Sequence, residues 1–368
     1  MRRGEALKMT GQEEPRGSKV HGFGIVGCGV IAPIHARAIA ALPNARLVTV
    51  TDIVSERARS FAATYGVECD ASLSELLARP DVDVVSVCVP SGLHADIGVR
   101  AAEAGKHLLV EKPIDISLPA ADRLIDAARN RGVTLSVVSQ HRFDPGLVEL
   151  HDLLERGALG RLVLGAASIK WYRTQAYYDA GAWRGTLALD GGGALMNQGV
   201  HYTDLLRWSM GAVEEVTALC ATQNHAIEVE DVALAMLRFR SGAIGMLEAS
   251  TSVFPGLPER LEVSGTGGSV IIEDGAIVLR AFVGENADMA SSSVANAKPA
   301  EKSGAAADPG ALPIGAHMAQ IADLLDSIDE HRSPIVSGEE ARNALEVVCA
   351  VYESARRHTS VSLPLRSA

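Results

Sequence analysis

The sequence predicts an α/β protein: a doubly wound parallel sheet in the first part of the chain, then a second α/β domain with an open, mostly antiparallel sheet. Short apolar segments alternate with segments of helical spacing up to about residue 145, which is the pattern of consecutive β-α-β units. Beyond that point strand-like segments follow one another closely, as antiparallel strands do. The chain has 368 residues, of which 47% are hydrophobic, and is long enough for two cores.

The first part contains five predicted strands with helices between them. The segment 82–89 is almost continuously apolar, as expected for a parallel strand buried on both faces. Ser55 is expected to cap the second helix. The strands are predicted at 20–26, 47–51, 82–89, 107–110 and 134–138, and the helices at 31–42, 55–65, 93–104 and 117–131.

The second part is predicted to be rich in strands. A segment over 285–310 contains mainly Ala, Ser, Gly and Pro and is expected to form an exposed loop. The strands are predicted at 161–170, 213–222, 229–240, 243–250, 260–264, 269–272 and 276–280, and the helices at 146–156, 192–210, 314–330 and 339–357.

Composition and charge exclude several classes of protein. The net charge of −11 argues against a general nucleic-acid binder, which usually presents a basic surface. No stretch of about 18 apolar residues is present, so we expect no membrane-spanning helix, and residues 1–18 lack the apolar segment of a signal peptide. The cysteines form no C-x-x-C pair, so we expect buried thiols and a reducing, cytoplasmic setting. They are Cys28, Cys69, Cys88, Cys220 and Cys349.

A glycine-rich turn follows the first predicted strand. Gly27, Gly29 and Ala32 form the pattern G-x-G-x-x-A, with Val30 and Ile31 between them. The first glycine permits a tight turn, the second lets the backbone approach a pyrophosphate, and the alanine allows the helix to pack closely on the strand. The helix that begins here offers free N–H groups to phosphates. The pattern therefore indicates a dinucleotide site of the Rossmann type.

Asp52 strengthens this interpretation because it ends the second predicted strand. A carboxylate at that place can accept hydrogen bonds from both ribose hydroxyls of NAD and repels the 2′-phosphate of NADP. We therefore expect NAD as the cofactor. Arg57 and Arg59 lie close by in the sequence and leave NADP possible.

Polar residues also follow the other strands of the predicted parallel sheet. Ligands of such sheets bind outside the carboxyl ends of the strands. Glu111 and Lys112 end a short buried strand, and Pro113 restricts Lys112 to extended conformations, which helps to aim its side chain. The residues expected to contact the cofactor here are Pro90, His94, Glu111, Lys112 and Gln140.

Three consecutive glycines at 191–193 introduce the most informative stretch of the second part. Glycines allow the backbone to approach a ligand closely. The helix predicted after them carries Asn197, His201 and Asp204 at spacings i, i+4 and i+7, which places all three on one face. His201 can accept a proton near neutral pH, and Asp204 could orient it or its neighbours. The alternative is that His201 is a buried histidine with a purely structural role.

A cluster of aromatic and arginine residues precedes the glycines in a chain that has few aromatics. Such a cluster fits a sugar or an acidic substrate, and equally fits packing between domains. The residues expected to bind substrate are Arg142, Tyr172, Trp183, Arg184 and Asp204. No metal site is expected, because the histidines lack the spacing of ligand pairs.

Together these motifs resemble the Gfo/Idh/MocA oxidoreductase family over roughly residues 20–365. The resemblance rests on the glycine turn with His35, on the segments 104–107 and 111–113, on the triple glycine with His201 and Asp204, and on Leu363 and Pro364. It implies an NAD-binding Rossmann domain over 19–140 and a substrate-binding and oligomerisation domain over 141–368. It also implies pairing into homodimers or homotetramers. Residues 1–18 contain Arg, Lys and Glu without an apolar segment and are expected to be a mobile tail or a mis-assigned start.

The resemblance implies that Lys112 and His201 are catalytic. Asn197 departs from the family, because many members carry Asp there, and an amide cannot act as a base. The expected reaction transfers a hydride between a nicotinamide and a carbon of a sugar, an inositol or a related polyol, nucleotide sugars included. Two alternatives remain open at this stage: a glycosidase that retains its NAD, and a non-catalytic NAD-sensing regulator.

Overall fold

The computed structural model describes residues 19–284 and 313–365. The tail expected over 1–18 and the loop expected over 285–310 lie outside the described residues. Within the described part of the chain, no helix is long and apolar enough to cross a bilayer.

The first sheet is parallel throughout, with strand order β3-β2-β1-β4-β5-β6. This is the order of a doubly wound dinucleotide-binding sheet, as the alternation of strands and helices predicts. The strands are β1 (His21–Val26), β2 (Ala45–Thr51), β3 (Glu68–Cys69), β4 (Val84–Val87), β5 (His107–Val110) and β6 (Leu135–Val137).

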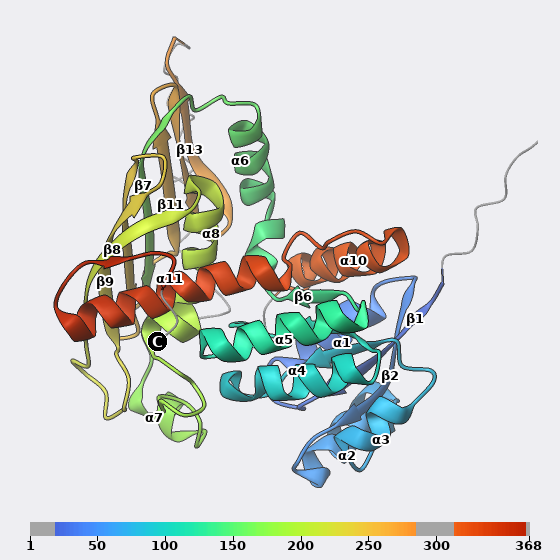
Figure 1. Ribbon diagram of the computed structural model, residues 1–368. Coiled ribbons are helices and arrows are strands. Elements are labelled where there is room, and N and C mark those ends of the chain that lie inside the picture. The colour runs from blue at the N-terminus through green and yellow to red at the C-terminus, as the bar shows by residue number, and fades with distance from the viewer. Residues whose placement is uncertain (1–18, 285–312, 366–368) are drawn as a thin grey trace, which may run out of the picture.

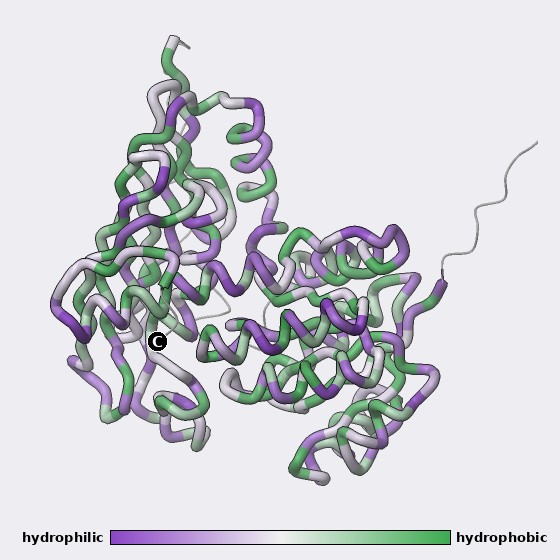
Figure 2. Tube along the Cα trace, viewed as in Figure 1, coloured by the Kyte–Doolittle hydropathy of each residue, from purple (hydrophilic) through white to green (hydrophobic). Residues whose placement is uncertain are grey.

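Helices cover both faces of this sheet (Figure 1). On one face, Phe23 and Ile25 of β1 pack with α1 (Ala32–Ala40), α2 (Ser55–Tyr65) and α10 (Gly315–Glu330), although α10 comes from the far end of the chain. The other face packs against α3 (Leu73–Ala78), α4 (His94–Glu103) and α5 (Leu118–Arg131). The helices of this layer alternate between hydrophilic and hydrophobic residues along their length (Figure 2), as expected when only one side is buried.

The second sheet has eight strands in the order β13-β12-β11-β7-β10-β9-β8-β14. Only the pair β7–β10 is parallel among the strand pairs described, so the expectation of a mostly antiparallel sheet is confirmed. The strands are β7 (Leu162–Lys170), β8 (Val213–Ala221), β9 (Val232–Phe239), β10 (Ile244–Ser250), β11 (Arg260–Gly265), β12 (Gly268–Glu273), β13 (Ala276–Phe282) and β14 (Val361–Ser362).

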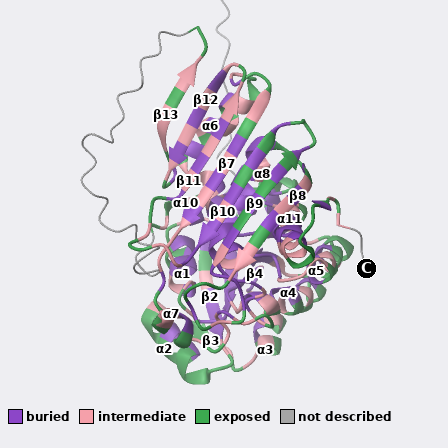
Figure 3. Cartoon of the chain, turned by 90° about the vertical axis from the view of Figure 1, so that its left-hand side faces the viewer, coloured by how far each residue is buried: buried purple, intermediate pink, exposed green. Residues whose placement is uncertain are grey.

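One face of the second sheet is covered by α6 (Pro145–Glu155), α8 (Val200–Met210) and α11 (Gly338–Arg357). The opposite face of β8, β9 and β10 carries exposed residues (Figure 3). A short helix, α7 (Gln175–Asp179), lies in the long connection between β7 and α8.

Several local expectations were wrong. Ser55 does not cap α2, because Val54 has the extended backbone of the cap position and Ser55 already belongs to the first turn. The single helix predicted over 192–210 is a π-helical turn over Ala194–Gly199 that runs into α8. Cys69 is exposed rather than buried, since it lies on the two-residue edge strand β3.

Candidate active site

The glycine turn joins the end of β1 to the start of α1. Gly27 has a φ of +93°, and a side chain there would collide with the carbonyl oxygen of Cys88, so the turn requires glycine. Above Gly29, in contrast, no atom lies within 4 Å of the place where a Cβ would stand. No side chain caps the N-terminus of α1. The open space and the free N–H groups both suit a pyrophosphate.

Asp52 lies beside this turn at the end of β2. Its carboxylate accepts hydrogen bonds from the backbone nitrogens of Cys28 (2.8 Å) and Val54 (2.8 Å), and Arg57 approaches it at 3.5 Å. Asp52 therefore braces the glycine turn, which the sequence did not indicate. Arg59 pairs instead with Glu56 on the surface.

Lys112 projects from the end of β5 toward the π-helical turn. Its ammonium donates hydrogen bonds to Asn197, at 2.7 Å to the backbone oxygen and 3.3 Å to the side-chain oxygen. Burial lowers the pKa of Lys112, and the carboxylates of Glu111 and Asp190 oppose that change. The structure thus joins two of the residues expected to be catalytic, although they lie 85 positions apart.

The imidazole of His201 forms no hydrogen bond within the described part of the chain, and its Nδ1 is buried. Burial, followed by the charges of Lys112, His141 and His317, holds its pKa well below the ordinary value of 6.5. The imidazole is therefore neutral and able to accept a proton. His201 and Lys112 line the same small cavity.

Asp204 does not orient His201, because no hydrogen bond joins them. Its carboxylate instead accepts hydrogen bonds from Arg142, at 2.7 and 2.5 Å, and from Ser139 at 2.6 Å. Arg142 also reaches Glu340 of α11 at 3.0 Å. Arg142 and Asp204 were both expected to bind substrate. Their side chains are almost fully buried and form an ion pair with each other.

The expectation that the triple glycine lets the backbone approach a ligand is wrong. Side chains at Gly191, Gly192 and Gly193 would collide with Ile116, the Tyr352 hydroxyl and the Glu230 backbone oxygen, respectively. The glycines thus allow close packing against the protein's own chain rather than against a ligand. The Glu230 carboxylate then accepts hydrogen bonds from the nitrogens of Gly193 (2.9 Å) and Leu195 (2.8 Å), which anchors the turn that carries Asn197.

Gly29 and Gly193 give a matched pair of predictions. Gly29→Ala should leave the unfolding midpoint unchanged and weaken NAD binding, because the new methyl group enters open space beside the turn. Gly193→Ala should destabilise the fold by about 1–3 kcal/mol, because its methyl group overlaps a backbone oxygen. Thermal unfolding and NAD titration measure both effects. Equal unfolding midpoints for the two variants would contradict this assignment.

The other residues expected to contact the cofactor lie at the strand ends, in differing environments. Both ring nitrogens of His94 lie at hydrogen-bonding distance from backbone oxygens, Nδ1 from that of Pro113 (2.7 Å) and Nε2 from that of Val89 (2.9 Å). Because a carbonyl oxygen only accepts, His94 donates its ring N–H to one of them, and its ring lies between two strand ends. Pro90 precedes a short 3-10 turn, and Gln140 begins another with its side-chain oxygen buried and unpartnered. Val30 is half exposed at the glycine turn.

The Glu111 carboxylate forms no hydrogen bond with the Lys112 ammonium among the described residues, and its contacts include side chains of the first domain. It accepts a hydrogen bond from His35 at 2.8 Å, and despite burial this contact lowers its pKa to about 2. His317 lies close enough that one ligand atom from each of the three residues falls within 4.8 Å of the others. His35 also bonds Ser86, so both of its nitrogens are used. This donor set fits a buried ion pair.

The aromatic and arginine cluster forms around α7. Arg184 lies 4.5 Å from the ring centre of Tyr177 and 5.5 Å from that of Trp183. The guanidinium group of Arg173 also lies over the Tyr177 ring, 4.7 Å from its centre. Tyr172 instead packs edge-on against Phe254, so it does not belong to this stack.

Two ionisable residues near Lys112, Asp190 and Glu259, were missed as site residues, and His141 lies against His201. Asp190 accepts a hydrogen bond from the Asn197 amide, and burial raises its pKa to about 6. Burial likewise raises the pKa of Glu259 to about 7. His141 packs edge-on against His201, with ring centres 5.1 Å apart. Asp190 directly precedes the triple glycine, so its position was the one available signal.

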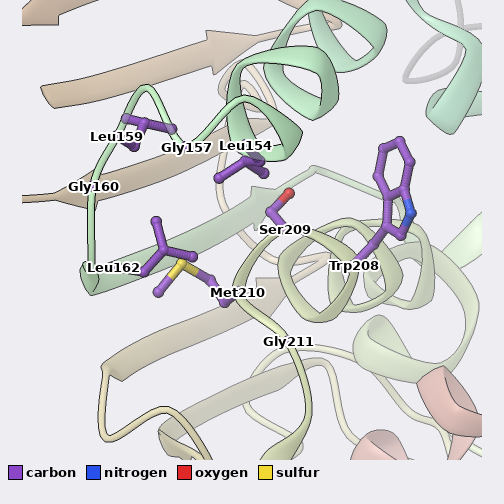
Figure 4. A pocket seen from close by; sticks show the side chains of 9 residues that line it. All are labelled: Leu154, Gly157, Leu159, Gly160, Leu162, Trp208, Ser209, Met210 and Gly211. Atoms are coloured by element: carbon purple, nitrogen blue, oxygen red, sulfur yellow. The ribbon is translucent and has the colours of Figure 1, made fainter. Parts of the chain in front are cut away.

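A separate surface hollow lies between the end of α6, the start of β7 and the end of α8 (Figure 4). Its lining includes Leu154, Leu162, Trp208, Ser209 and Met210, and no ionisable side chain. Neither Lys112 nor His201 contributes to it, so it offers none of the groups that the site above combines.

Comparison with known proteins bears on both domains. A family model described as an oxidoreductase family with an NAD-binding Rossmann fold matches residues 21–139, and a GFO/IDH/MocA C-terminal domain matches residues 147–271. The myo-inositol 2-dehydrogenase of Thermotoga maritima is 27% identical over 93% of this chain and 98% of its own. The NAD-dependent scyllo-inositol 2-dehydrogenase of Bacillus subtilis is 30% identical over 67% of this chain and 72% of its own.

Among solved structures, the WlbA dehydrogenase from Bordetella pertussis is similar in both fold and sequence. It was solved in complex with NADH and UDP-GlcNAcA. The match has a TM-score of 0.85 and 32% identity, and it covers 96% of this chain and 100% of that one.

Proposed function

Because this chain belongs to the GFO/IDH/MocA family of oxidoreductases, we propose that it is an NAD-dependent dehydrogenase acting on a hydroxyl carbon of a sugar, an inositol or a related polyol. One observation carries the proposal. Lys112, held by Asn197, and a neutral His201 line one cavity at the carboxyl edge of the parallel sheet. Residues 19–140 then hold the cofactor, and residues 141–368 supply the substrate and oligomer contacts.

The chain's own residues divide the work of oxidation between a base and a cation. A substrate hydroxyl placed between them would give its proton to the neutral imidazole of His201. The Lys112 ammonium would stabilise the negative charge that develops on the oxygen. Asn197 cannot take the proton, and it holds Lys112 in place. Bound NAD supplies the hydride acceptor, which no side chain can provide.

Relatives support the substrate class. The names of the two curated relatives specify inositols, and the WlbA structure contains a nucleotide sugar. The arginine and aromatic side chains around α7 suit a polyhydroxylated or acidic substrate, because guanidinium groups bind carboxylates and phosphates. The substrate is therefore sought among inositols, aldoses, polyols and nucleotide sugars.

The test is NADH formation measured by absorbance, with each of these substrates and with NAD and NADP in parallel. Turnover with one class and NAD is the expected result. Net glycoside hydrolysis with a cofactor that is never released would favour the NAD-retaining glycosidase instead. NAD binding without turnover on any substrate would favour a regulator.

Asp52 is expected to set the preference for NAD over NADP. Replacing Asp52 with Ser should raise the activity with NADP relative to NAD by about tenfold, because a charged hydrogen bond to the ribose and a repulsive charge are lost. The ratio of kcat/KM for the two cofactors measures this. Glu56→Ser, which removes an exposed carboxylate one turn away, is the control, and an equal change in both variants would contradict the role of Asp52.

A homo-oligomer is proposed from the exposed face of the second sheet. Met236 and Met246 are neighbours on β9 and β10 and are 66% and 46% exposed. Leu219 lies opposite Leu234 on the neighbouring strand, and Leu234 and Ile244 lie two positions from Met236 and Met246, so these exposed residues extend the same apolar face. Figure 3 shows exposed residues on this face of β8, β9 and β10. An exposed apolar patch of this kind is typical of a protein interface.

Charges placed on this face should dissociate the oligomer. Met236→Lys combined with Met246→Lys is expected to reduce the mass measured by light scattering to that of a monomer, because charges do not bury at an apolar interface. Leu187→Lys, at an exposed loop leucine, is the control. A monomeric wild type would contradict the proposal. The free state of all five cysteines fits a reducing compartment, and we propose the cytoplasm.

A further inference from the structure

Asn197 lies between a cation and a carboxylate. Its side-chain oxygen accepts a hydrogen bond from the Lys112 ammonium at 3.3 Å, and its side-chain nitrogen donates to Asp190 Oδ1 at 2.8 Å. The orientation of the amide follows from its partners, because an ammonium only donates and a carboxylate only accepts. The amide therefore links Lys112 to Asp190.

Asp190 is itself held rigidly. It is 2% exposed, and its second oxygen accepts a hydrogen bond from the backbone nitrogen of Gly185 at 2.8 Å. Among the described residues, its side chain is bonded by the backbone nitrogen of Gly185 and the amide of Asn197, neither of which carries a charge. Its neighbours of opposite charge are Lys112 and Arg184, which interact with it across a longer distance. A buried carboxylate without a direct cation is costly unless its charge serves a nearby group.

Two other carboxylates, those of Glu111 and Glu259, also lie near Lys112. Glu111 bonds to His35 at 2.8 Å, and its second oxygen accepts the backbone nitrogen of Lys112 at 3.1 Å. Glu259 faces Lys112 from the second domain, whereas Arg173 opposes it with a like charge. Asp190 is the carboxylate that reaches the Lys112 ammonium through a continuous chain of hydrogen bonds.

We propose that Asp190 is a positioning residue of the dehydrogenase reaction, which acts through the Asn197 amide to fix the Lys112 ammonium and to favour its charged form. The inference rests on the proposed function for its kinetic consequence only. A carboxylate one hydrogen bond further away still opposes loss of the proton from Lys112. The ammonium then keeps a fixed direction and leaves its remaining N–H for the substrate oxygen.

The test compares a variant that loses the Asp190 charge with a double variant that exchanges the residues at 190 and 197. Asp190→Asn removes the charge, and it should lower kcat by about a hundredfold, the effect of a misplaced catalytic group. KM for NAD should not change. In the double variant D190N/N197D the amide and the carboxylate exchange places, so the chain of hydrogen bonds is kept. This variant should recover at least about tenfold of the lost kcat.

A second readout does not depend on the substrate. Acetic anhydride modifies only neutral amines, and peptide mass spectrometry of the NAD-bound protein follows Lys112 as a function of pH. In D190N the onset of modification should move to lower pH, and in D190N/N197D it should return toward that of the wild type. Asp179→Asn, at an exposed aspartate of α7, should change neither measurement.

The outcomes separate the inference from the proposed function. Unchanged Lys112 modification in D190N would overturn the inference, and so would an exchange variant no better than D190N. A wild type that oxidises no sugar or polyol would overturn the proposed function and leave the modification experiment valid. If D190N does not fold, the exchange variant decides alone: Lys112 modification like that of the wild type supports the inference, and an earlier onset overturns it.

Discussion

Replacing Lys112 with alanine is expected to lower kcat by about a thousandfold while NAD binding changes little. The ammonium is the cation at the reacting oxygen, and removing a single group that stabilises such a charge costs about 10²–10³ in kcat. The main contacts expected for NAD are the glycine turn and Asp52, which follow β1 and β2, whereas Lys112 follows β5. Steady-state kinetics and NAD titration by fluorescence measure the two effects separately.

A surface lysine provides the control for this experiment. Lys19 pairs with Asp83 and its side chain is 61% exposed, so Lys19→Ala should leave both measurements unchanged. If Lys112→Ala lost NAD binding in proportion to turnover, the lysine would hold the cofactor rather than serve the reaction, and the proposed mechanism would fail.

Asp204→Asn is expected to lower the free energy of unfolding by about 3 kcal/mol. The substitution removes the negative charge that Arg142 contacts twice, in a place where the arginine side chain is 1% exposed. Arg142 would keep its contact with Glu340, which Arg207 shares, and its buried charge would be poorly compensated. A poorly compensated buried charge costs far more than the intact pair contributes. Denaturant unfolding followed by circular dichroism measures the loss.

This variant also decides between two roles for Asp204. If the residue only holds the protein together, the folded variant should retain the wild-type KM for substrate. A large rise in KM with unchanged stability would instead restore the expected role in substrate binding. Asp122→Asn is the matched control, because its ion pair with Arg342 lies at the surface and should contribute less than about 1 kcal/mol.

The regular elements were predictable where they are long enough to display a period. The strand expected at 107–110 is β5 at those residues, and the helix expected over 117–131 is α5 with Ser117 as its cap. The two-residue strands β3 and β14 and the five-residue helix α7 were missed. Two residues show no alternation, and such strands form only because a neighbouring strand offers hydrogen bonds.

The π-helical turn shows why one side of the site was misjudged. Spacing along a regular helix placed Asn197, His201 and Asp204 on one face, as is true of an α-helix. The turn over Ala194–Gly199 winds differently, so Asn197 meets Lys112 while Asp204 meets Arg142. The Glu230 carboxylate that anchors the turn comes from a segment more than 30 positions further along the chain, and no local pattern announces it.

The sequence by itself determined the order of the longer strands and helices, the glycine turn and the location of Lys112 and His201, because periodicity, turns and strand ends are local properties. Only the tertiary structure decided which charged side chains form ion pairs or are linked by hydrogen bonds. The pairs His35–Glu111 and Arg142–Asp204 and the link from Lys112 through Asn197 to Asp190 join residues on different elements. Such contacts depend on how elements distant in sequence pack, and packing is settled by the whole chain at once.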